Sequence, residues 1–443
     1  MAGVLPERLL AGAATSQALK PHSEMTGGTW RGWALDALAL ALMVFGVWHV
    51  ARVLPSRAVG NDFAHCYITS RLLLTGADVY SMPLQPEYDR FGFRYTHVIP
   101  TATNPPLLVE AFAPFAMLPP WGAFWAWTAL EILSLGCLLL LSWRLTASRL
   151  SAQARRLVCA GIVASAPVYW HFFFSQWQLL LGAMILIAYT CLRNGRPTVA
   201  CLLITIATWL KLFPVLLVPW FLWRAGPDWK TRGKCAGAVL VSSAGLVAIG
   251  GLELWRQFWL HGMKVLRAWI EWQRHFDFTV PSFVKNAAWA LHNFDPEWTG
   301  LHKWAEVGAV CGIALVTLTY GVSWWNAQRQ KDVDMEGEFC LLSIAMLAGI
   351  AEGWGHYFVM LAFPVAVAVA RVAVRPTTGR VTVLGLSFVM LNVMGDFRSP
   401  WLEFPASYIP LYGLSLLGAF FAYELWGSKP GTANVTTIAR QLQ

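Results

Sequence analysis

The chain has 443 residues, of which 57% are hydrophobic and only 13% are charged, and its mean hydropathy of +0.50 excludes a soluble domain of this length. Long, nearly uncharged segments recur along it and indicate an all-α polytopic membrane protein. The net charge of +9 does not indicate nucleic acid, because the basic residues lie in short loops between apolar segments, where they set membrane topology.

Neither the cysteines nor the two ends of the chain indicate a functional site. The eight cysteines lie mostly inside apolar runs, without a CxxC motif or paired spacing, so we expect neither a metal site nor a disulfide framework. Residues 1–30 lack the apolar core of a signal peptide and are interpreted as a disordered cytoplasmic tail. Residues 31–427 are expected to form a single transmembrane domain, and residues 428–443 a second cytoplasmic tail.

The first predicted span, residues 33–53, begins in the cytoplasm because Lys20 and Arg31 precede it. It leads into a polar and aromatic region, residues 54–120, that contains Asp62 close to the membrane exit. Within this region residues 107–118 are apolar but too short for a span, which favours a helix lying at the membrane interface.

The next span, residues 121–143, fixes the orientation. It ends at the densest basic loop of the chain, formed by Arg144, Arg149, Arg155 and Arg156. The positive-inside rule places this loop in the cytoplasm, and therefore places the Asp62 loop on the outer side. Residues 157–173 then return outward and residues 177–192 come back in, ending at further basic residues.

Residues 198–223 look like one span. However, the basic loops before and after them both have to be cytoplasmic, and a single crossing would place these two loops on opposite sides of the membrane. Because Pro214 removes a backbone donor, we predict two short helices broken at residues 209–214. A broken helix in a membrane is tolerated only where it is buried or lines a cavity. Lys211 would lie at the outer mouth or in a polar pocket beneath it; alternatively, it snorkels to the headgroups.

The second half contains another long outer region, residues 253–303, which is rich in Trp, Arg and His and includes Arg274. This region could line a groove for a lipid-phosphate headgroup or a glycan, or form an amphipathic helix on the bilayer. Residues 304–426 continue to alternate across the membrane. The total is about twelve crossings, several of them short, with both ends cytoplasmic.

On this topology the unusual polar residues share the outer side: Asp62, His65, His171, Gln176, Lys211, Glu352, His356, Asp396 and Arg398. Moving a sugar from a lipid phosphate requires one general base and a cation for the departing phosphate. A glycosidase usually requires two carboxylates across the bond. The chain has no Walker loop, no GxGxxG after a strand and no DxD pair, which argues against direct use of a nucleotide sugar.

Five groups of residues resemble those of a known family in their order along the chain and in the side of the membrane on which they are expected. They are Asn61-Asp62-Phe63 with Tyr67, Gly76 and Tyr80; Tyr95 with Asn104-Pro105-Pro106; Ser175-Gln176-Trp177-Gln178; Lys211-Leu212-Phe213-Pro214; and Trp354-Gly355-His356-Tyr357. Over roughly residues 60–365 the chain resembles glycosyltransferase family 87. These are GT-C-type membrane enzymes similar to polyprenyl-phosphate-mannose-dependent α-1,2-mannosyltransferases. Residues 175–178 differ at two positions from the family's Gly-Gln-x-Asn, and the region after Trp272 resembles it only loosely.

The resemblance implies a GT-C-type helical bundle in the cell membrane with its active site facing the periplasm or outside. It implies a polyprenyl-phosphate sugar as donor, a lipid or glycan as acceptor, and inverting transfer of a hexose, most simply mannose. It implies Asp62 as general base, Lys211 as a cation near the phosphate, and His356 as a phosphate or acceptor contact. Further substrate-binding candidates are Gln176, Arg274 and Tyr357. We expect no cofactor and no metal ion, since no acidic pair accompanies Asp62.

Other interpretations stay open at this point. Asp62 could only cap the helix that would begin near Phe63, and His356 could be structural. A transporter or flippase would show paired charges and two halves with broken helices at corresponding positions, whereas only one clear break is present, at residues 211–214. A membrane scaffold would leave Asp62, Lys211 and His356 without a role.

Overall fold

The computed structural model describes residues 29–57, 61–93, 100–272, 277–293, 295, 298, 300–329, 333–393, 404 and 406–427. Every regular element in these residues is a helix, and the one isolated β-bridge joins Asp277 to Trp354. The all-α class is therefore confirmed. The predicted features at Tyr95, Arg274, Asp396 and Arg398 lie outside the described residues.

Six helical segments of the described chain are long and apolar enough to cross a membrane, which agrees with a polytopic membrane protein. They are α1 (Thr29–Arg57), α5 (Pro120–Leu145), α11 (Trp229–Ile249), α15 (Leu301–Arg329), η3 with α17 (Gly355–Leu361 and Ala362–Val374) and α20 (Ile409–Gly427). The pair α6 (Ala152–Val163) and α7 (Ala166–Phe174), bent by 43°, makes a seventh if it is one span.

Shorter helices fill the bundle between these segments: α8 (Gln178–Arg193), α9 (Pro197–Leu210), η1 (Phe213–Leu217), α10 (Val218–Arg224), α14 (Val280–Leu291), α16 (Met335–Gly349) and α18 (Thr378–Asn392). Several of the predicted crossings fall on these helices, which do not qualify as spans by their own length. The total of about twelve crossings therefore stays a prediction.

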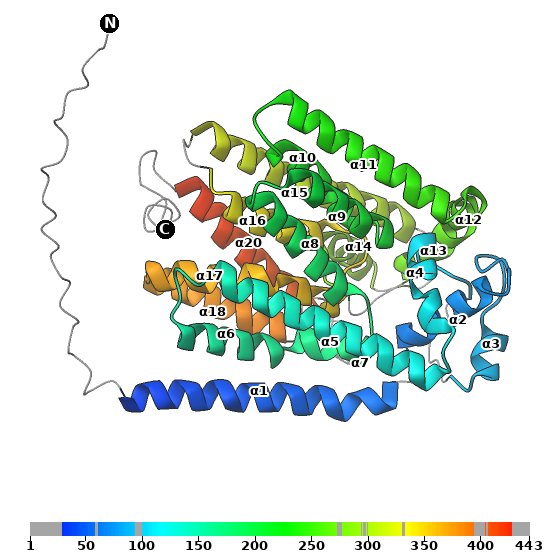
Figure 1. Ribbon diagram of the computed structural model, residues 1–443, viewed down its shortest axis with the longest axis horizontal. Helices are drawn as coiled ribbons and strands as arrows, with labels where there is room; N and C mark the ends of the chain where they lie inside the picture. The colour runs from blue at the N-terminus through cyan, green and yellow to red at the C-terminus, as the bar shows by residue number, and fades with distance from the viewer. Residues whose placement is uncertain are drawn as a thin grey trace, which may run out of the picture.

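Figure 1 shows a second group of short helices gathered at one end of the bundle, on the right. They are α2 (Asn61–Leu73), α3 (Gln85–Arg90), α4 (Pro106–Ala116), α12 (Leu252–Gln257), the π-helical turn η2 (Phe258–Gly262) and α13 (Met263–Trp272). We call this the loop-rich end. Helices from both regions that the sequence assigns to one side of the membrane thus share one end of the molecule.

The opposite end carries half-buried ion pairs between helices. Arg149 pairs with Glu336 at 2.5 Å, Arg371 with Asp334 at 2.7 Å, and Arg380 with Glu424 at 2.5 Å. The arginines belong to the basic loops and helix ends that the sequence assigns to the cytoplasm. The positive charge is therefore held at the end away from Asp62.

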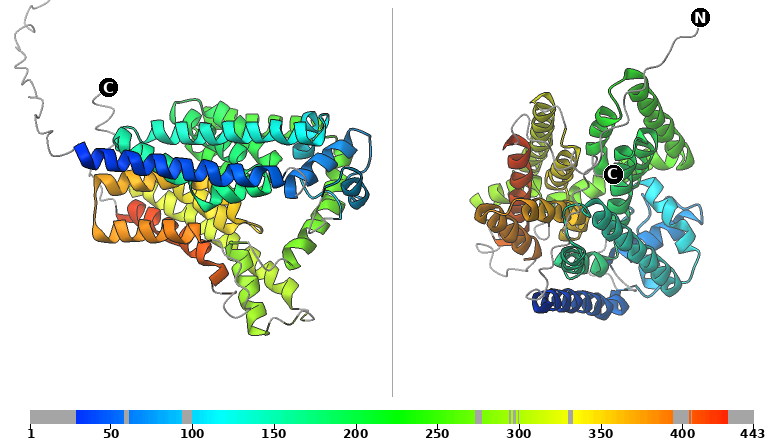
Figure 2. Two further views of the ribbon diagram at one scale, coloured as in Figure 1. Left: turned by 90° about the horizontal axis from the view of Figure 1, so that it is seen from below. Right: turned by 60° about the vertical axis from the view of Figure 1, so that its left-hand side comes forward.

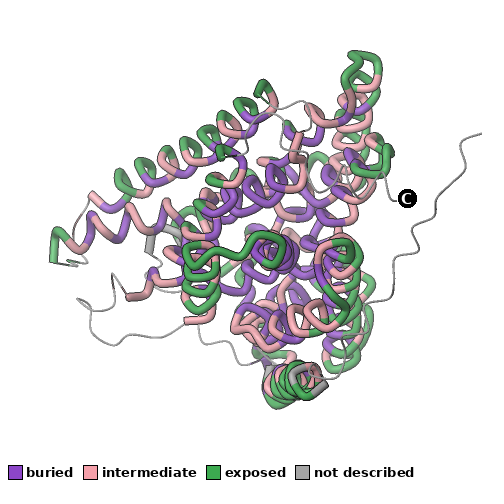
Figure 3. The backbone as a smooth tube through the Cα atoms, turned by 90° about the vertical axis from the view of Figure 1, so that its left-hand side faces the viewer, coloured by how far each residue is buried: buried purple, intermediate pink, exposed green. Residues whose placement is uncertain are grey.

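The core lies along the middle of the bundle, where the tube in Figure 3 is mostly purple. Helix α1 runs along the outside and packs on α6 and α7 (Figure 2). Its outward face is apolar and uncovered, with Trp33 77% and Trp48 53% exposed. An uncovered apolar face of this length is expected where lipid replaces water as the solvent.

The predicted break at residues 209–214 is confirmed. Helix α9 ends at Leu210, Lys211 has an extended backbone with φ −145° and ψ 122°, and Pro214 is the second residue of the 3-10 turn η1. Because proline has no amide hydrogen, the helical ladder cannot continue through this point. Lys211 therefore lies at the break itself, outside the regular α9 helix.

Candidate functional site

Asp62 lies in the first turn of α2, which begins at Asn61, so the carboxylate is inside the helix rather than at its cap. Exposed N–H groups at a helix N-terminus favour a negative charge there. The half-buried Asp62 carboxylate accepts a hydrogen bond from the side-chain amide of Gln176, 114 residues away. The structure therefore joins the proposed base to the third motif.

Gln176 is placed by a tight reversal between α7 and α8. Ser175 ends α7 with φ 55° and ψ 55°, the left-handed region that favours glycine. The family motif has glycine at this position, so the backbone geometry accounts for that preference. The indole Nε1 of Trp127 donates to the carbonyl of Ser175 at 3.3 Å and holds the turn against α5.

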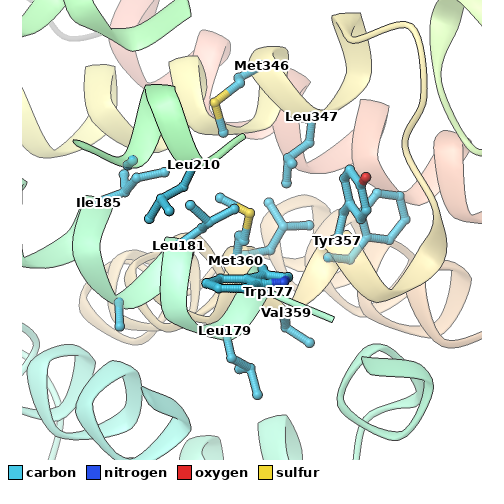
Figure 4. Close-up of a cluster of buried hydrophobic side chains, with 14 of the residues drawn as sticks. Trp177, Leu179, Leu181, Ile185, Leu210, Met346, Leu347, Tyr357, Val359 and Met360 are labelled. Carbon is cyan, nitrogen blue, oxygen red and sulfur yellow. The ribbon is translucent and has the colours of Figure 1, made fainter. Parts of the chain in front are cut away.

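Lys211 lies over Tyr357. Its Nζ is 5.8 Å from the centre of the Tyr357 ring, within the range of a cation–π interaction, and that ring packs on Phe213 with centroids 5.6 Å apart. No carboxylate of the described residues lies within ion-pair distance of Lys211. Figure 4 shows Tyr357 beside the buried apolar cluster that includes Trp177 and Val359. The ammonium group therefore sits on a rigid apolar and aromatic base.

His356 is only 2% exposed and is surrounded by rings. Its ring centroid lies 5.1 Å from that of Phe174 and 4.9 Å from that of Tyr357. Neither ring nitrogen has a hydrogen-bond partner among the described residues. Helix α7 and η3 pack together here, so His356 lies buried between the two elements, and its predicted contact with phosphate or acceptor stays a prediction.

The loop before η3 is fixed by Asp277, which is 3% exposed. Asp277 Oδ1 accepts the Gly353 N–H at 2.8 Å and the Thr279 hydroxyl at 3.1 Å. The Phe278 N–H donates in turn to the Gly353 carbonyl at 2.8 Å. These bonds clamp residues 352–356 to the start of α14.

The same loop presents a second carboxyl, Glu352, which the site prediction missed. The indole Nε1 of Trp354 donates to Glu352 Oε1 at 2.8 Å. Sequence reasoning placed Glu352 on the same side as Asp62 and Lys211, and the structure brings the three within electrostatic reach of one another. Nothing in the pattern distinguished Glu352 from other loop carboxylates. Asp277 was missed for a similar reason, because its partner is a backbone amide that a sequence does not reveal.

Electrostatics connect these groups into one site. Burial raises the pKa of Glu352 to about 7; the Lys211 ammonium opposes this rise, whereas the carboxylates of Asp277 and Asp62 add to it. Burial also raises the pKa of Asp277 to about 6. The side chains of Asp62, Gln176, Lys211, Glu352 and Trp354 are all half-buried, so solvent reaches each of them while their supporting residues are buried.

A buried layer behind Asp62 ties the remaining motifs together. The Cys66 thiol accepts from the Trp177 indole at 3.4 Å and from the Asn104 amide at 3.6 Å. The Tyr80 hydroxyl donates to the Asn104 carbonyl at 2.6 Å. Burial raises the pKa of Cys66 to about 12, so the thiol stays protonated and structural.

The Asp277 clamp gives a direct test. Asp277→Leu removes the acceptor of the Gly353 amide and is expected to lower turnover about tenfold or more by freeing the loop that carries Glu352 and His356. Asp277→Asn keeps an acceptor oxygen and is expected to retain most of the activity. Steady-state assays of both variants, each checked for intact folding by size-exclusion chromatography, decide the matter. Equal activity of the two would contradict the clamp.

The family model of glycosyltransferase family 87 matches residues 102–350, more than half of the chain. The match includes the motifs at Asn104, Gln176 and Lys211, whereas Asp62 and His356 lie outside it. No curated protein and no solved structure matches the chain. The chain therefore belongs to glycosyltransferase family 87 and is a membrane glycosyltransferase.

Proposed function

We propose that the protein transfers a hexose, mannose by family resemblance, from a polyprenyl-phosphate donor to a lipid or glycan acceptor. The observation that carries the proposal is the shared site of Asp62 and Lys211. The Asp62 carboxylate is oriented by Gln176, and both this carboxylate and the Lys211 ammonium act electrostatically on Glu352 and on Cys66. Lys211 itself forms no ion pair with a carboxylate of the described residues, and its ammonium lies over the Tyr357 ring. One base and one cation are the groups that displacement of a lipid phosphate requires.

The reaction is a single displacement. The acceptor hydroxyl oxygen attacks the anomeric carbon of the donor sugar while Asp62 takes the hydroxyl proton. The bond from the anomeric carbon to the phosphate oxygen breaks, and its electron pair stays on the phosphate. Lys211, which is fixed at the α9 break, stabilises this charge. Attack from the face opposite the phosphate inverts the anomeric configuration.

Two features support an outward-facing site in the cell membrane. The regions 54–120 and 253–303 contribute the loop-rich end, and the arginine ion pairs lie at the other end. Basic residues favour the cytoplasmic side, so the loop-rich end would face the periplasm or the outside. On this proposal residues 31–427 form one GT-C-type domain between two cytoplasmic tails.

A donor panel tests the proposal. The purified protein in lipid vesicles is offered polyprenyl-phosphate-mannose, polyprenyl-phosphate-glucose or GDP-mannose, together with a mixed pool of lipid and glycan acceptors. We expect transfer from a polyprenyl-phosphate sugar, with release of polyprenyl phosphate, and no transfer from the nucleotide sugar. Transfer from GDP-mannose alone, or from none of the three, would contradict it.

A further inference from the structure

Glu352 has no task in the displacement described above, since Asp62 serves as base and Lys211 meets the phosphate. Yet the Glu352 carboxyl is held in the same site, where its partial withdrawal from water costs free energy. A carboxyl that is partly withdrawn from water is unfavourable unless it has partners, and here burial raises the pKa of the half-buried Glu352 to about 7. A group kept in such a position calls for a specific partner.

The backbone around Glu352 is built to hold it still. Gly353 donates to Asp277, and a Cβ at position 353 would lie 2.4 Å from Thr279 Cγ2, so only glycine fits between the loop and α14. The Trp354 indole bonds one carboxyl oxygen, Oε1, at 2.8 Å. The other oxygen, Oε2, has no hydrogen-bond partner among the described residues. The half-buried side chain therefore presents one oxygen to the site.

The charge and hydrogen-bonding capacity of Glu352 Oε2 indicate which class of ligand it would bind. A carboxylate repels phosphate, so it does not complete the Lys211 anion site. Sugar hydroxyls both donate and accept hydrogen bonds, and they suit a carboxyl in either protonation state. Trp354 is also half-buried and adds an aromatic surface of the kind on which the C–H face of a sugar ring packs.

We propose that Glu352 and Trp354 form the subsite that binds the hydroxyl groups of the sugar being transferred, separate in function from the phosphate contact at Lys211. This inference rests on the proposed function. It assigns sugar recognition to the loop at residues 352–354 and makes Glu352 a specificity-determining residue.

The test separates the sugar contact from the phosphate contact. Glu352→Gln is nearly isosteric and keeps an acceptor for Trp354. Lys211→Met removes the cation, and Glu306→Gln changes a 67% exposed carboxyl on α15 as the matched control. Each variant is assayed in vesicles with polyprenyl-phosphate-mannose as substrate and with sugar-free polyprenyl phosphate as inhibitor.

Glu352→Gln is expected to lower kcat/KM for the mannose donor by about 10- to 100-fold while changing the inhibition constant of polyprenyl phosphate less than about twofold. Lys211→Met should weaken both the use of the mannose donor and the inhibition by polyprenyl phosphate, and Glu306→Gln should change neither. A Glu352→Gln variant that keeps the donor kcat/KM, or that weakens inhibition as much as donor use, would overturn the inference. If the wild-type protein transfers no sugar from either polyprenyl-phosphate-mannose or polyprenyl-phosphate-glucose, the proposed donor class fails and the sugar subsite falls with it.

Discussion

Asp62→Asn is expected to lower sugar transfer by about 10²- to 10⁴-fold, because the amide cannot take the proton of the acceptor hydroxyl. Asparagine has the same shape as aspartate, and its side-chain oxygen can still accept the bond from Gln176. The variant should therefore fold and insert like the wild-type protein. Transfer from polyprenyl-phosphate-mannose in vesicles measures the effect.

Asp89→Asn is the matched control, since Asp89 is an exposed carboxylate on α3 at the same loop-rich end and bonds only the exposed side chain of Gln85 in the described contacts. It should retain full activity. An Asp62→Asn variant as active as this control would remove Asp62 from the reaction. Loss of activity in both variants would point to a requirement for negative charge at this end rather than for one base.

The largest stability effect is expected at the opposite end, in the Arg224–Glu338 pair. Glu338 is fully buried and accepts two bonds from Arg224, at 2.5 and 2.9 Å, and one from the Trp220 indole at 3.1 Å. Arg224→Met leaves the carboxylate buried without its cation and should destabilise the protein by about 3–5 kcal/mol. Thermal unfolding in detergent reports the loss.

The double variant Arg224→Met with Glu338→Met removes both charges and is expected to recover most of that stability. Arg156→Met is the control, because its pair with Asp36 is about half exposed and should contribute no more than about 1 kcal/mol. A single Arg224→Met variant as stable as the Arg156→Met variant would show that the buried pair contributes little.

Local sequence patterns were sufficient to predict much of this architecture. Apolar length predicted the six described helices that are long enough to cross a membrane, whereas the total of about twelve crossings stays a prediction. The distribution of arginines separated the two ends. The conflict between loop charge and a single span, together with Pro214, located the break that positions Lys211. Asp62 was identified because a carboxylate close to a membrane exit is costly and needs a reason.

Contacts between distant segments were not predictable in the same way. The Asp277–Gly353 bond joins residues 76 apart and involves a backbone amide. Glu131, inside the span α5, pairs with His171 at 2.5 Å, and both side chains are fully buried. Sequence reasoning placed His171 near the outer side and gave Glu131 no role, because a lone carboxyl in an apolar run does not reveal its partner on another helix.

The most direct test of the central assignment is the stereochemistry and stoichiometry of one turnover in vesicles. The anomeric configuration of the transferred sugar is compared with that in the polyprenyl-phosphate donor, and released polyprenyl phosphate is counted for the wild-type protein and Asp62→Asn. Inversion, with one polyprenyl phosphate released per sugar and no product from the variant, is the predicted result. Retention of configuration, or turnover by Asp62→Asn, would contradict a single displacement with Asp62 as base.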